Sequence, residues 1–315
     1  MFSTFSFCCP GLTRRVISTK YASKRARDRD PRCYTLLSFI DIHLSAIPNA
    51  SRNSHAFSVR ASPRNFFFEQ KILDLLAEDD NDHSALKACS LVCQTFLHIC
   101  RKHIFGSITL DDNHAISHLA THALTLLLCE RPEIADYIRK LDYTIEVGDL
   151  TSPSIQESLQ RISRLQCLMI CHRSSPNLDW SNNPIRPVLL HLLHLPTLTH
   201  FEVTNIDNFV VSDLIPCVNL KYLSIGFHTT AATETTFPAA LPEQSIQLNE
   251  FVAATRTADA ITKLCKTRRP DGRPVVDFGS LSKMAVFLRK LNEGEALQEL
   301  SRRCQVLTHV NISCK

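Results

Sequence analysis

The sequence predicts an α/β chain in which a short all-helical module, residues 66–110, precedes an irregular repeat of strands and helices over residues 111–315. Three observations predict this organisation: helix-like apolar spacing around residue 90, a strand-like motif that recurs after it, and basic residues concentrated in the first 65 positions. A chain of 315 residues, 44% of them hydrophobic, has enough apolar side chains for a large core.

The first 65 residues are predicted to form a disordered basic tail. Residues 1–64 hold eleven lysine or arginine residues against three acids, a net charge of about +8. The opening stretch "MFSTFSFCCPGLTRRVISTKYASKRARDRD" is rich in arginine and serine and poor in acids, which is also typical of a mitochondrial transit peptide. An upstream extension that is not part of the working protein is the third interpretation.

The rest of the chain argues against two classes of partner. Beyond residue 64 the chain has 24 of its 35 basic residues and 28 of its 31 acidic residues, a net charge of about −4. Nucleic-acid-binding domains are usually basic, so this composition argues against nucleic acid as a partner. No apolar run reaches the roughly 18 residues that cross a membrane, and the richest one, "VLLHLLHL", is interrupted by His191 and His194. Thirteen cysteines, an odd number in a long chain, indicate reduced thiols and a cytoplasmic or nuclear protein, with mitochondria as the alternative.

Short amphipathic helices are expected between residues 66 and 104. The stretch "FFFEQKILDLL" has helical apolar spacing, and the polar run "EDDNDHS" ends it. Ser84 is the expected N-cap of a second helix, which runs over residues 85–100. Its apolar face follows spacings of three and four: Ala85, Ala88, Cys89, Val92, Cys93, Phe96, Leu97 and Cys100. Helices this short do not bury their own apolar faces, so the module needs a partner, either within the same chain or in another protein.

A motif of the form apolar-x-x-apolar-x-apolar recurs through the second half of the chain. It occurs at Ile138/Leu141/Tyr143, Leu165/Leu168/Ile170, Leu198/Phe201/Val203, Leu220/Leu223/Ile225, Leu248/Phe251/Ala253, Leu281/Met284/Val286 and Leu307/Val310/Ile312. Its first positions are 27, 33, 22, 28, 33 and 26 residues apart, close to the period of leucine-rich repeats. In that class each unit adds a short strand to a shared sheet and returns along the outside through a helix or turn.

The segments between the motifs agree with this interpretation. Helices are expected within residues 152–163, 184–194 and 293–304. The asparagine of the repeat consensus is missing in most units, so the turns are expected to close differently. The last strand, "QVLTHVNIS", has no polar cap, which predicts that a partner covers it or that the chain ends early relative to its relatives. An ordinary α/β protein with the same alternation is the alternative.

No metal, cofactor or catalytic site is predicted. Cys89, Cys93 and Cys100 alternate with core-facing residues, and Cys167 and Cys171 share one side of a predicted strand with His172 next to them, so these thiols are expected to be small buried packing groups. No nucleophile elbow or zinc-protease motif is present. The triplet Asp277-Phe278-Gly279 follows no glycine-rich loop or kinase catalytic segment and is a chance match. The chain is therefore expected not to be an enzyme.

Residues 66–110 carry a family resemblance. The quoted stretches are "ILDLL" and "ALKACSLVCQTFLHICRKHIFGSITL". The second resembles the F-box helix "LKACSLVC", with Phe96 where tryptophan is frequent and "HIFGSITL" at the passage into the first strand of the ligand-binding region. The chain from residue 66 onward resembles the F-box proteins with degenerate leucine-rich repeats of mushroom-forming (basidiomycete) fungi.

The resemblance implies a fold, a function and partners. The expected fold is an all-helical F-box followed by an irregular leucine-rich-repeat solenoid. The expected function is substrate recognition in a ubiquitin ligase, where a Skp-type adaptor connects the chain to a cullin and a RING subunit, and the repeats bind an unknown protein substrate. The residues assigned to adaptor contact are Phe67, Glu69, Ile72, Leu73, Leu76, Leu86, Val92, Cys93, Phe96 and Leu97.

One departure from the family leaves a second function open. The family opens its first helix with Leu-Pro-x-Glu-Leu or close to it, where the proline begins the helix. Here the stretch is "FFFEQ", which keeps Glu69 but replaces the Leu-Pro pair by Phe66-Phe67 and the second leucine by Gln70. The alternative function is therefore a leucine-rich-repeat scaffold with an F-box that no longer binds the adaptor.

Overall fold

The computed structural model describes residues 84–110, 119–174, 177–232, 241–289 and 291–314, together with residues 71, 73, 74 and 76. The predicted basic tail, residues 1–65, lies outside the described residues. So do the stretch "FFFEQ" and the predicted contact residues Phe67, Glu69 and Ile72.

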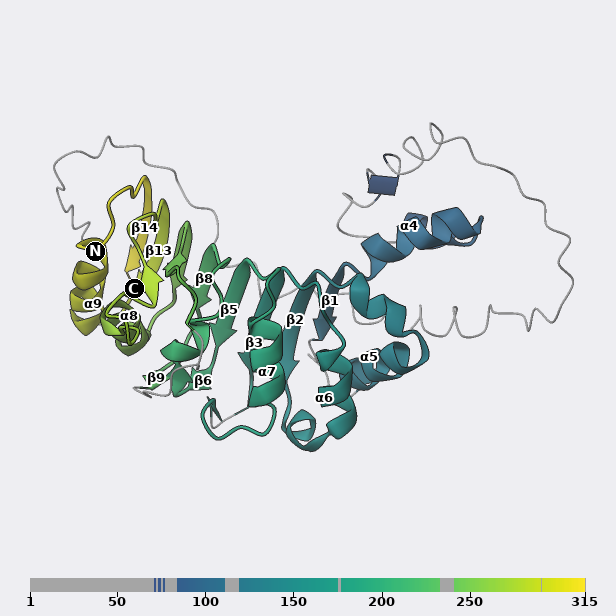
Figure 1. Cartoon of the computed structure of the whole chain (residues 1–315), viewed down its shortest axis with the longest axis horizontal. Coiled ribbons are helices and arrows are strands. Elements are labelled where there is room, and N and C mark those ends of the chain that lie inside the picture. Colours follow the sequence, from purple (N-terminus) through teal and green to yellow (C-terminus); the bar gives the residue numbers. More distant parts are fainter. Residues whose placement is uncertain are drawn as a thin grey trace, which may run out of the picture. The chain divides into compact units, whose positions relative to one another are not determined.

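A parallel sheet of eight strands organises the described part of the chain (Figure 1). Its strands are β1 (Ser107–Leu110), β2 (Lys140–Ile145), β3 (Cys167–His172), β5 (His200–Thr204), β8 (Tyr222–Ile225), β11 (Glu250–Ala253), β13 (Lys283–Leu288) and β14 (His309–Cys314). Their order in the sheet follows their order in the chain, and every neighbouring pair is parallel. The predicted α/β class is confirmed at this level: a mixed fold built on a large parallel sheet.

The repeated motif coincides with the register of the sheet. Its central residues pair in one continuous row: Leu141, Leu168, Phe201, Leu223, Phe251, Met284 and Val310. The third positions pair in a second row that starts at Tyr143 and ends at Ile312. Phe105, Ile108 and Leu110 form an eighth match that the sequence analysis overlooked, because Ile108 and Leu110 pair with Leu141 and Tyr143. Spacing in the sequence thus predicted which residues align across the strands.

Helices and short strand pairs connect the sheet strands. The α-helices of the described residues are α3 (Ser84–Ser90), α4 (Gln94–Ile104), α5 (Leu119–Glu130), α6 (Pro153–Gln160), α7 (Arg186–Leu193), α8 (Ala258–Lys266) and α9 (Leu291–Ser301). The 3-10 helices are η1 (Pro132–Asp136), η2 (Val147–Thr151) and η3 (Val211–Leu214). The short strands are β4 (Leu178–Asp179), β6 (Ile206–Asp207), β7 (Phe209–Val210), β9 (Ala231–Ala232), β10 (Ile246–Gln247) and β12 (Val276–Asp277). The three helices expected between motifs are present as α6, α7 and α9.

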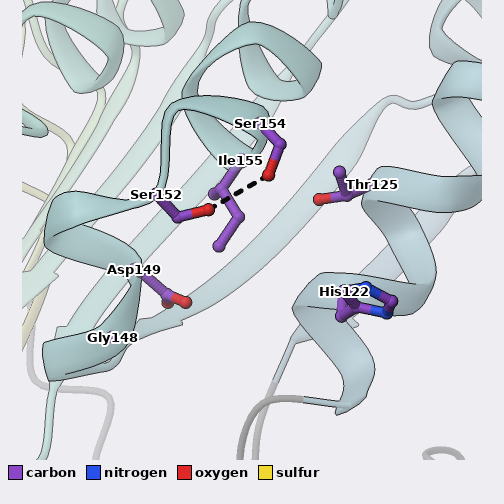
Figure 2. A pocket seen from close by; sticks show the side chains of 7 residues that line it. All are labelled: His122, Thr125, Gly148, Asp149, Ser152, Ser154 and Ile155. Atoms are coloured by element: carbon purple, nitrogen blue, oxygen red, sulfur yellow. Dashed lines mark hydrogen bonds between the residues drawn. The ribbon is translucent and has the colours of Figure 1, made fainter.

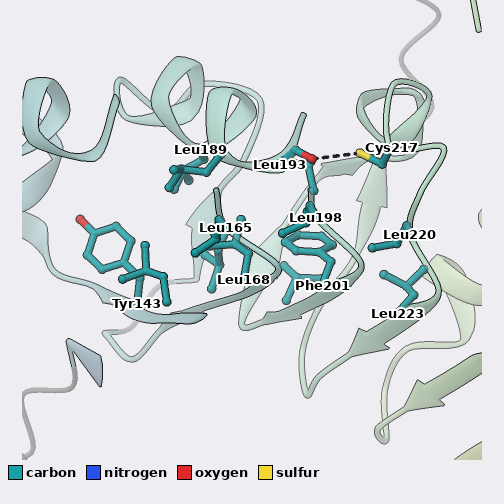
Figure 3. Packing of buried hydrophobic residues seen from close by; sticks show 14 of the residues in the cluster. Tyr143, Leu165, Leu168, Leu189, Leu193, Leu198, Phe201, Cys217, Leu220 and Leu223 are labelled. Atoms are coloured by element: carbon teal, nitrogen blue, oxygen red, sulfur yellow. Dashed lines mark hydrogen bonds between the residues drawn. The ribbon is translucent and has the colours of Figure 1, made fainter. Parts of the chain in front are cut away.

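The two faces of the sheet differ in burial. On β3, Leu168 and Ile170 are buried, while Cys167, Met169 and Cys171 are partly exposed, as the two-residue alternation of a strand requires. The buried positions join one core cluster with the helices, and Figure 3 shows Leu168 and Phe201 among leucines of α7 and of neighbouring units. We call the other side of the sheet the open face. Its side chains include Lys140, Asp142, Cys167, Met169, Cys171, His200, Glu202, Tyr222, Glu250, Lys283 and Phe287.

An asparagine, Asn205, closes the turn that directly follows β5. Asn205 has a φ of 57°, in the left-handed region that asparagine tolerates better than most residues. Its side-chain Nδ2 donates to the carbonyl of His172 on the preceding strand at 2.8 Å, and its backbone N–H donates to the carbonyl of Phe227 at 2.9 Å. Asn205, which follows β5, therefore contacts β3 through His172 and the segment after β8 through Phe227.

The predicted single helix over residues 85–100 is wrong. The chain leaves the helix after Ser90, and the backbone N–H groups of Leu91 and Val92 donate three residues back, to Ala88 and Cys89. Ser90 Oγ donates to the carbonyl of Lys87 at 2.6 Å, the group that Leu91 N–H uses in a continuous helix. Cys93 is extended and precedes α4. Ser84, predicted to be the N-cap that precedes the helix, is instead the first residue of α3.

The described sheet ends on β14. Val310 and Ile312 occupy the two core rows but are exposed, because only β13 pairs with this strand among the described residues. The polar cap that the sequence lacks is therefore also lacking around these two side chains in the described part of the chain.

Candidate functional site

The turn between α3 and α4 presents an apolar surface. Leu91 and Val92 are 64% and 69% exposed, and Cys93 beside them is exposed. Leu97, one turn into α4, is half-buried. We call Leu91, Val92, Cys93 and Leu97 the turn surface. Large apolar side chains that are exposed next to one another are typical of protein-binding sites.

The structure divides the predicted contact residues into two groups. Leu73 and Leu86 are fully buried in the core, and Leu76 and Phe96 pack against it. Val92, Cys93 and Leu97 belong to the turn surface. The sequence analysis did not separate these groups, because it assumed one continuous helix through residues 85–100, and the break after Ser90 leaves Val92 exposed.

Sequence reasoning missed Leu91. The assumed continuous helix puts Leu91 off the apolar face, so it was not selected as a contact residue. The signal that finds it is Ser90, whose hydroxyl competes for a backbone carbonyl and favours a helix end at this place.

Polar contacts hold α4 against the sheet region. The hydroxyl of Tyr137, which follows η1, is 3.1 Å from His98 Nδ1, and the two rings meet edge to face with centroids 5.8 Å apart. Arg101 pairs with Glu133 at 3.9 Å, and His103 Nε2 lies 3.0 Å from Asp74 Oδ1. These contacts fix the orientation in which α4 presents the turn surface.

The cysteines of the helical module are not equivalent, so their prediction as buried packing groups is wrong in part. Cys100 is buried and Cys89 is half-buried against the core, but Cys93 is exposed. Burial, together with the neighbouring Cys89, raises the pKa of the Cys100 thiol to about 11. Since the thiolate is the reactive form, burial protects Cys100 both sterically and chemically.

Alkylation with N-ethylmaleimide should therefore distinguish these thiols. In the folded chain at pH 7.5 we expect Cys93 to be modified long before Cys100, whose thiolate fraction is lowered about a hundredfold by the raised pKa. Raising the pH to 9 should leave Cys100 slow, because this pH is still below its pKa. Peptide mass mapping over time measures both rates, and a urea-unfolded sample provides the control in which both react. Equal rates in the folded chain would contradict the assigned burial.

The cysteine side chains of β3 and its histidine lie on opposite sides of the strand. Cys167 and Cys171 are half-buried on the open face, and His172 is buried on the opposite side, as the predicted alternation requires. Burial lowers the pKa of His172. Within the described ranges, no group of three or more His, Cys, Asp or Glu side chains is arranged to hold a metal ion. No helix found there is both long and apolar enough to cross a membrane.

A cavity of about 230 Å³ lies between α5 and the segment formed by η2 and α6 (Figure 2). It is lined by His122, Thr125, Gly148, Asp149, Ser152, Ser154 and Ile155. Asp149 Oδ2 accepts hydrogen bonds from the Tyr143 hydroxyl at 2.9 Å and from the backbone N–H of Glu146 at 3.1 Å, and the hydroxyls of Ser152 and Ser154 are 3.1 Å apart. Figure 2 shows His122 on α5, across the cavity from both serines. The Asp149 carboxylate therefore connects η2 to Tyr143 on β2, and we assign it a structural role.

The triplet Asp277-Phe278-Gly279 also has a structural role. Asp277 Oδ1 accepts the backbone N–H of Gly279 at 2.9 Å, and the buried Phe278 ring meets Phe251 edge to face with centroids 5.7 Å apart. The carboxylate therefore closes a turn that places Phe278 in the core.

Comparisons with known proteins add no family assignment. No protein-family model matches the chain, and no curated protein matches it.

Proposed function

We propose that this chain is the substrate-recognition subunit of a Skp-cullin-F-box ubiquitin ligase. The turn surface between α3 and α4 binds the Skp-type adaptor, and the sheet region is a degenerate leucine-rich-repeat solenoid whose open face binds a protein substrate. The observation that carries the proposal is the exposure of Leu91 and Val92 in the segment that resembles the F-box.

Two further features support the repeat part of the proposal. Strands that follow chain order in one parallel sheet are what stacked repeat units produce, because each unit contacts its neighbours. The repeated motif supplies the same two core rows in every unit, from Leu141 and Tyr143 onward.

The turn surface has the chemistry that helical docking sites use. Its side chains are apolar, lie close together in sequence, and are presented by helices anchored through His98 and Tyr137. Burying Leu91 and Val92 in a partner groove removes apolar area from water without displacing any side chain of the core. Leu73 and Leu86 are fully buried in the core, so we do not assign them to adaptor contact.

The test is co-expression of the full chain with a Skp-type adaptor, followed by measurement of co-purification and affinity. A Leu91→Asp/Val92→Asp variant should weaken capture by at least about thirtyfold, because it places two charges in an apolar interface. Leu86→Asp is unsuitable, because Leu86 is fully buried and the variant is expected to unfold.

The matched control is Val147→Asp/Val306→Asp. It introduces the same two charges at exposed apolar positions away from the turn surface. Circular dichroism verifies that both variants keep the parent fold. Capture that survives Leu91→Asp/Val92→Asp contradicts the assigned surface, and no capture by a folded parent contradicts adaptor binding.

The scaffold without adaptor binding is the second candidate function. The burial of Leu73 and Leu86 favours it, because two residues expected to contact the adaptor are already used by the core. In that case the folded parent captures no adaptor, while the open face still binds its protein partner.

A further inference from the structure

The centre of the open face carries an aromatic pair between carboxylates. His200 on β5, Tyr222 on β8 and Glu250 on β11 are direct register partners on three adjacent strands. Glu202 lies two residues beyond His200, so it projects from the same face of β5. Neighbouring strands are about 4.8 Å apart, which keeps all four side chains within reach of one bound group. We call these four residues the acidic aromatic patch.

The two rings form a stacked pair, which we call the platform; their inner faces contact each other, so a ligand stacks on an outer ring face. The His200 and Tyr222 rings are stacked, with centroids 5.5 Å apart and planes inclined by 28°. The hydroxyl of Thr199 lies 2.8 Å from His200 Nδ1 and holds the imidazole in this orientation. His200 is exposed and Tyr222 is half-buried, so the platform is accessible from the open face.

Two glutamate carboxylates act on the Tyr222 phenol. Burial raises the pKa of Tyr222, and the nearby carboxylates of Glu202 and Glu250 raise it further, while a hydrogen bond with Ser224 acts in the opposite direction. The same negative field that disfavours a phenolate favours a bound cation.

Lys283 on β13 is a resident cation that a ligand can replace. Its Nζ lies 3.6 Å from Glu250 Oε2, and the two side chains are 59% and 38% exposed. An ion pair this exposed is weak, because water screens it and its formation restricts two flexible side chains. A better cation therefore displaces Lys283 at small cost.

We propose that the acidic aromatic patch binds an arginine side chain carried by a peptide segment of the protein partner. The guanidinium is planar, stacks on tyrosine, and donates hydrogen bonds to carboxylates in two directions, which matches a platform lined by Glu202 and Glu250. The net charge of about −4 beyond residue 64 also favours a cationic segment. The proposal rests on the proposed function in taking the open face as the partner-binding face, and it names the chemistry of that partner.

The experiment measures fluorescence anisotropy of labelled ten-residue peptides with the full chain at low salt, without adaptor. Three glycine-serine peptides of equal length carry either two arginines, two lysines or two glutamates. The parent should bind the arginine peptide several-fold more tightly than the lysine peptide, because stacking adds to charge attraction. The glutamate peptide reports binding to the basic residues 1–64, so its affinity should not fall in variants that remove carboxylates from the patch.

Matched charge variants locate the site. Glu202→Gln/Glu250→Gln should weaken binding of the arginine peptide by about tenfold or more, because both carboxylates are lost. Glu130→Gln/Glu157→Gln removes the same charge from exposed positions on α5 and α6 and should leave affinity within about twofold of the parent. Tyr222→Leu should abolish the preference for arginine over lysine.

Removal of the resident cation gives an effect of opposite sign. Lys283→Ala should tighten binding of the arginine peptide by about two- to fourfold, because Glu250 no longer has to exchange partners. Lys266→Ala, at an exposed position of α8, changes the net charge equally and should have a smaller effect.

Several outcomes overturn the proposal. They are no binding of the arginine peptide by the folded parent, equal loss in both glutamate double variants, and equal affinity of the parent for arginine and lysine peptides. Because no adaptor is present, none of these results depends on the turn surface. Failed adaptor capture likewise leaves the arginine measurement interpretable.

Discussion

Phe201→Ala should lower the free energy of unfolding by about 4 kcal/mol, the largest effect that we expect from a substitution by alanine in this chain. Phe201 is fully buried at the centre of the sheet, in the row that also contains Leu168 and Leu223. Its ring lies 6.0 Å from the ring of Phe209, which in turn meets Trp180 at 5.2 Å. Truncation leaves a cavity that neighbouring units fill poorly, because the strands on both sides fix the backbone.

Urea unfolding followed by circular dichroism measures this effect. Phe201→Leu keeps most of the volume and should cost about 1 kcal/mol. Phe287→Ala is the matched control, because it is the same chemical change on the open face, where Phe287 is 37% exposed, and it should cost less than about 1 kcal/mol. Similar losses of stability for Phe201→Ala and Phe287→Ala would contradict the assignment of Phe201 to the buried face and Phe287 to the open face.

Asp213→Ala should lower the free energy of unfolding by about 3 kcal/mol, the second largest effect expected. Asp213 on η3 connects two segments that are distant in sequence. Its Oδ2 accepts a hydrogen bond from Trp180 Nε1 at 2.7 Å and from Arg186 Nη2 at 3.0 Å, and its Oδ1 accepts from the same Arg186 nitrogen at 3.2 Å. The variant removes the acceptor of the fully buried indole N–H and one partner of a guanidinium that is only 21% exposed.

Asp213→Asn separates the two contributions. The amide oxygen still accepts from Trp180, but the charge that Arg186 pairs with is lost, so the cost should fall to about 1–2 kcal/mol. Glu133→Ala breaks the more exposed ion pair with Arg101 and should cost less than about 1 kcal/mol. Urea unfolding measures the stability of all three variants. The emission of Trp180 follows the transition, since Trp180 is the chain's sole tryptophan. A cost for Asp213→Ala no larger than that for Glu133→Ala would contradict the assigned network.

The strands and their pairing were largely predictable from the sequence. Each motif places apolar residues two apart, which is the period of a strand with one buried face, and repetition indicates that the units pair in the same register. The row from Leu141 to Val310 follows from this rule alone. The overlooked match at Phe105 follows the same pattern, but it is joined to the helical segment and was assigned to the passage into the strands.

The helical module was predicted less well. Apolar periodicity through residues 85–100 is compatible with one helix, and the break after Ser90 depends on a single side-chain hydrogen bond. That break exposes Val92 and Cys93, so the prediction of Cys93 as a buried packing group is wrong. The contact residues were therefore predicted only as a set, and the tertiary structure divides them into buried and exposed residues.

The acidic aromatic patch was not predictable from one sequence. His200, Tyr222 and Glu250 are separated by more than twenty residues along the chain at each step, and polar positions of strands carry no pattern that marks a site. They meet because consecutive parallel strands align equal positions of successive units.

The sequence by itself determined the α/β class, the row of core residues and the segments that form strands, because burial of apolar side chains imposes a period that is visible in the chain. The tertiary structure alone decided which helical residues face solvent and which open-face side chains are neighbours. Those properties arise from a local helix end and from strand register, and both bring together residues whose types and spacing leave their contacts undetermined.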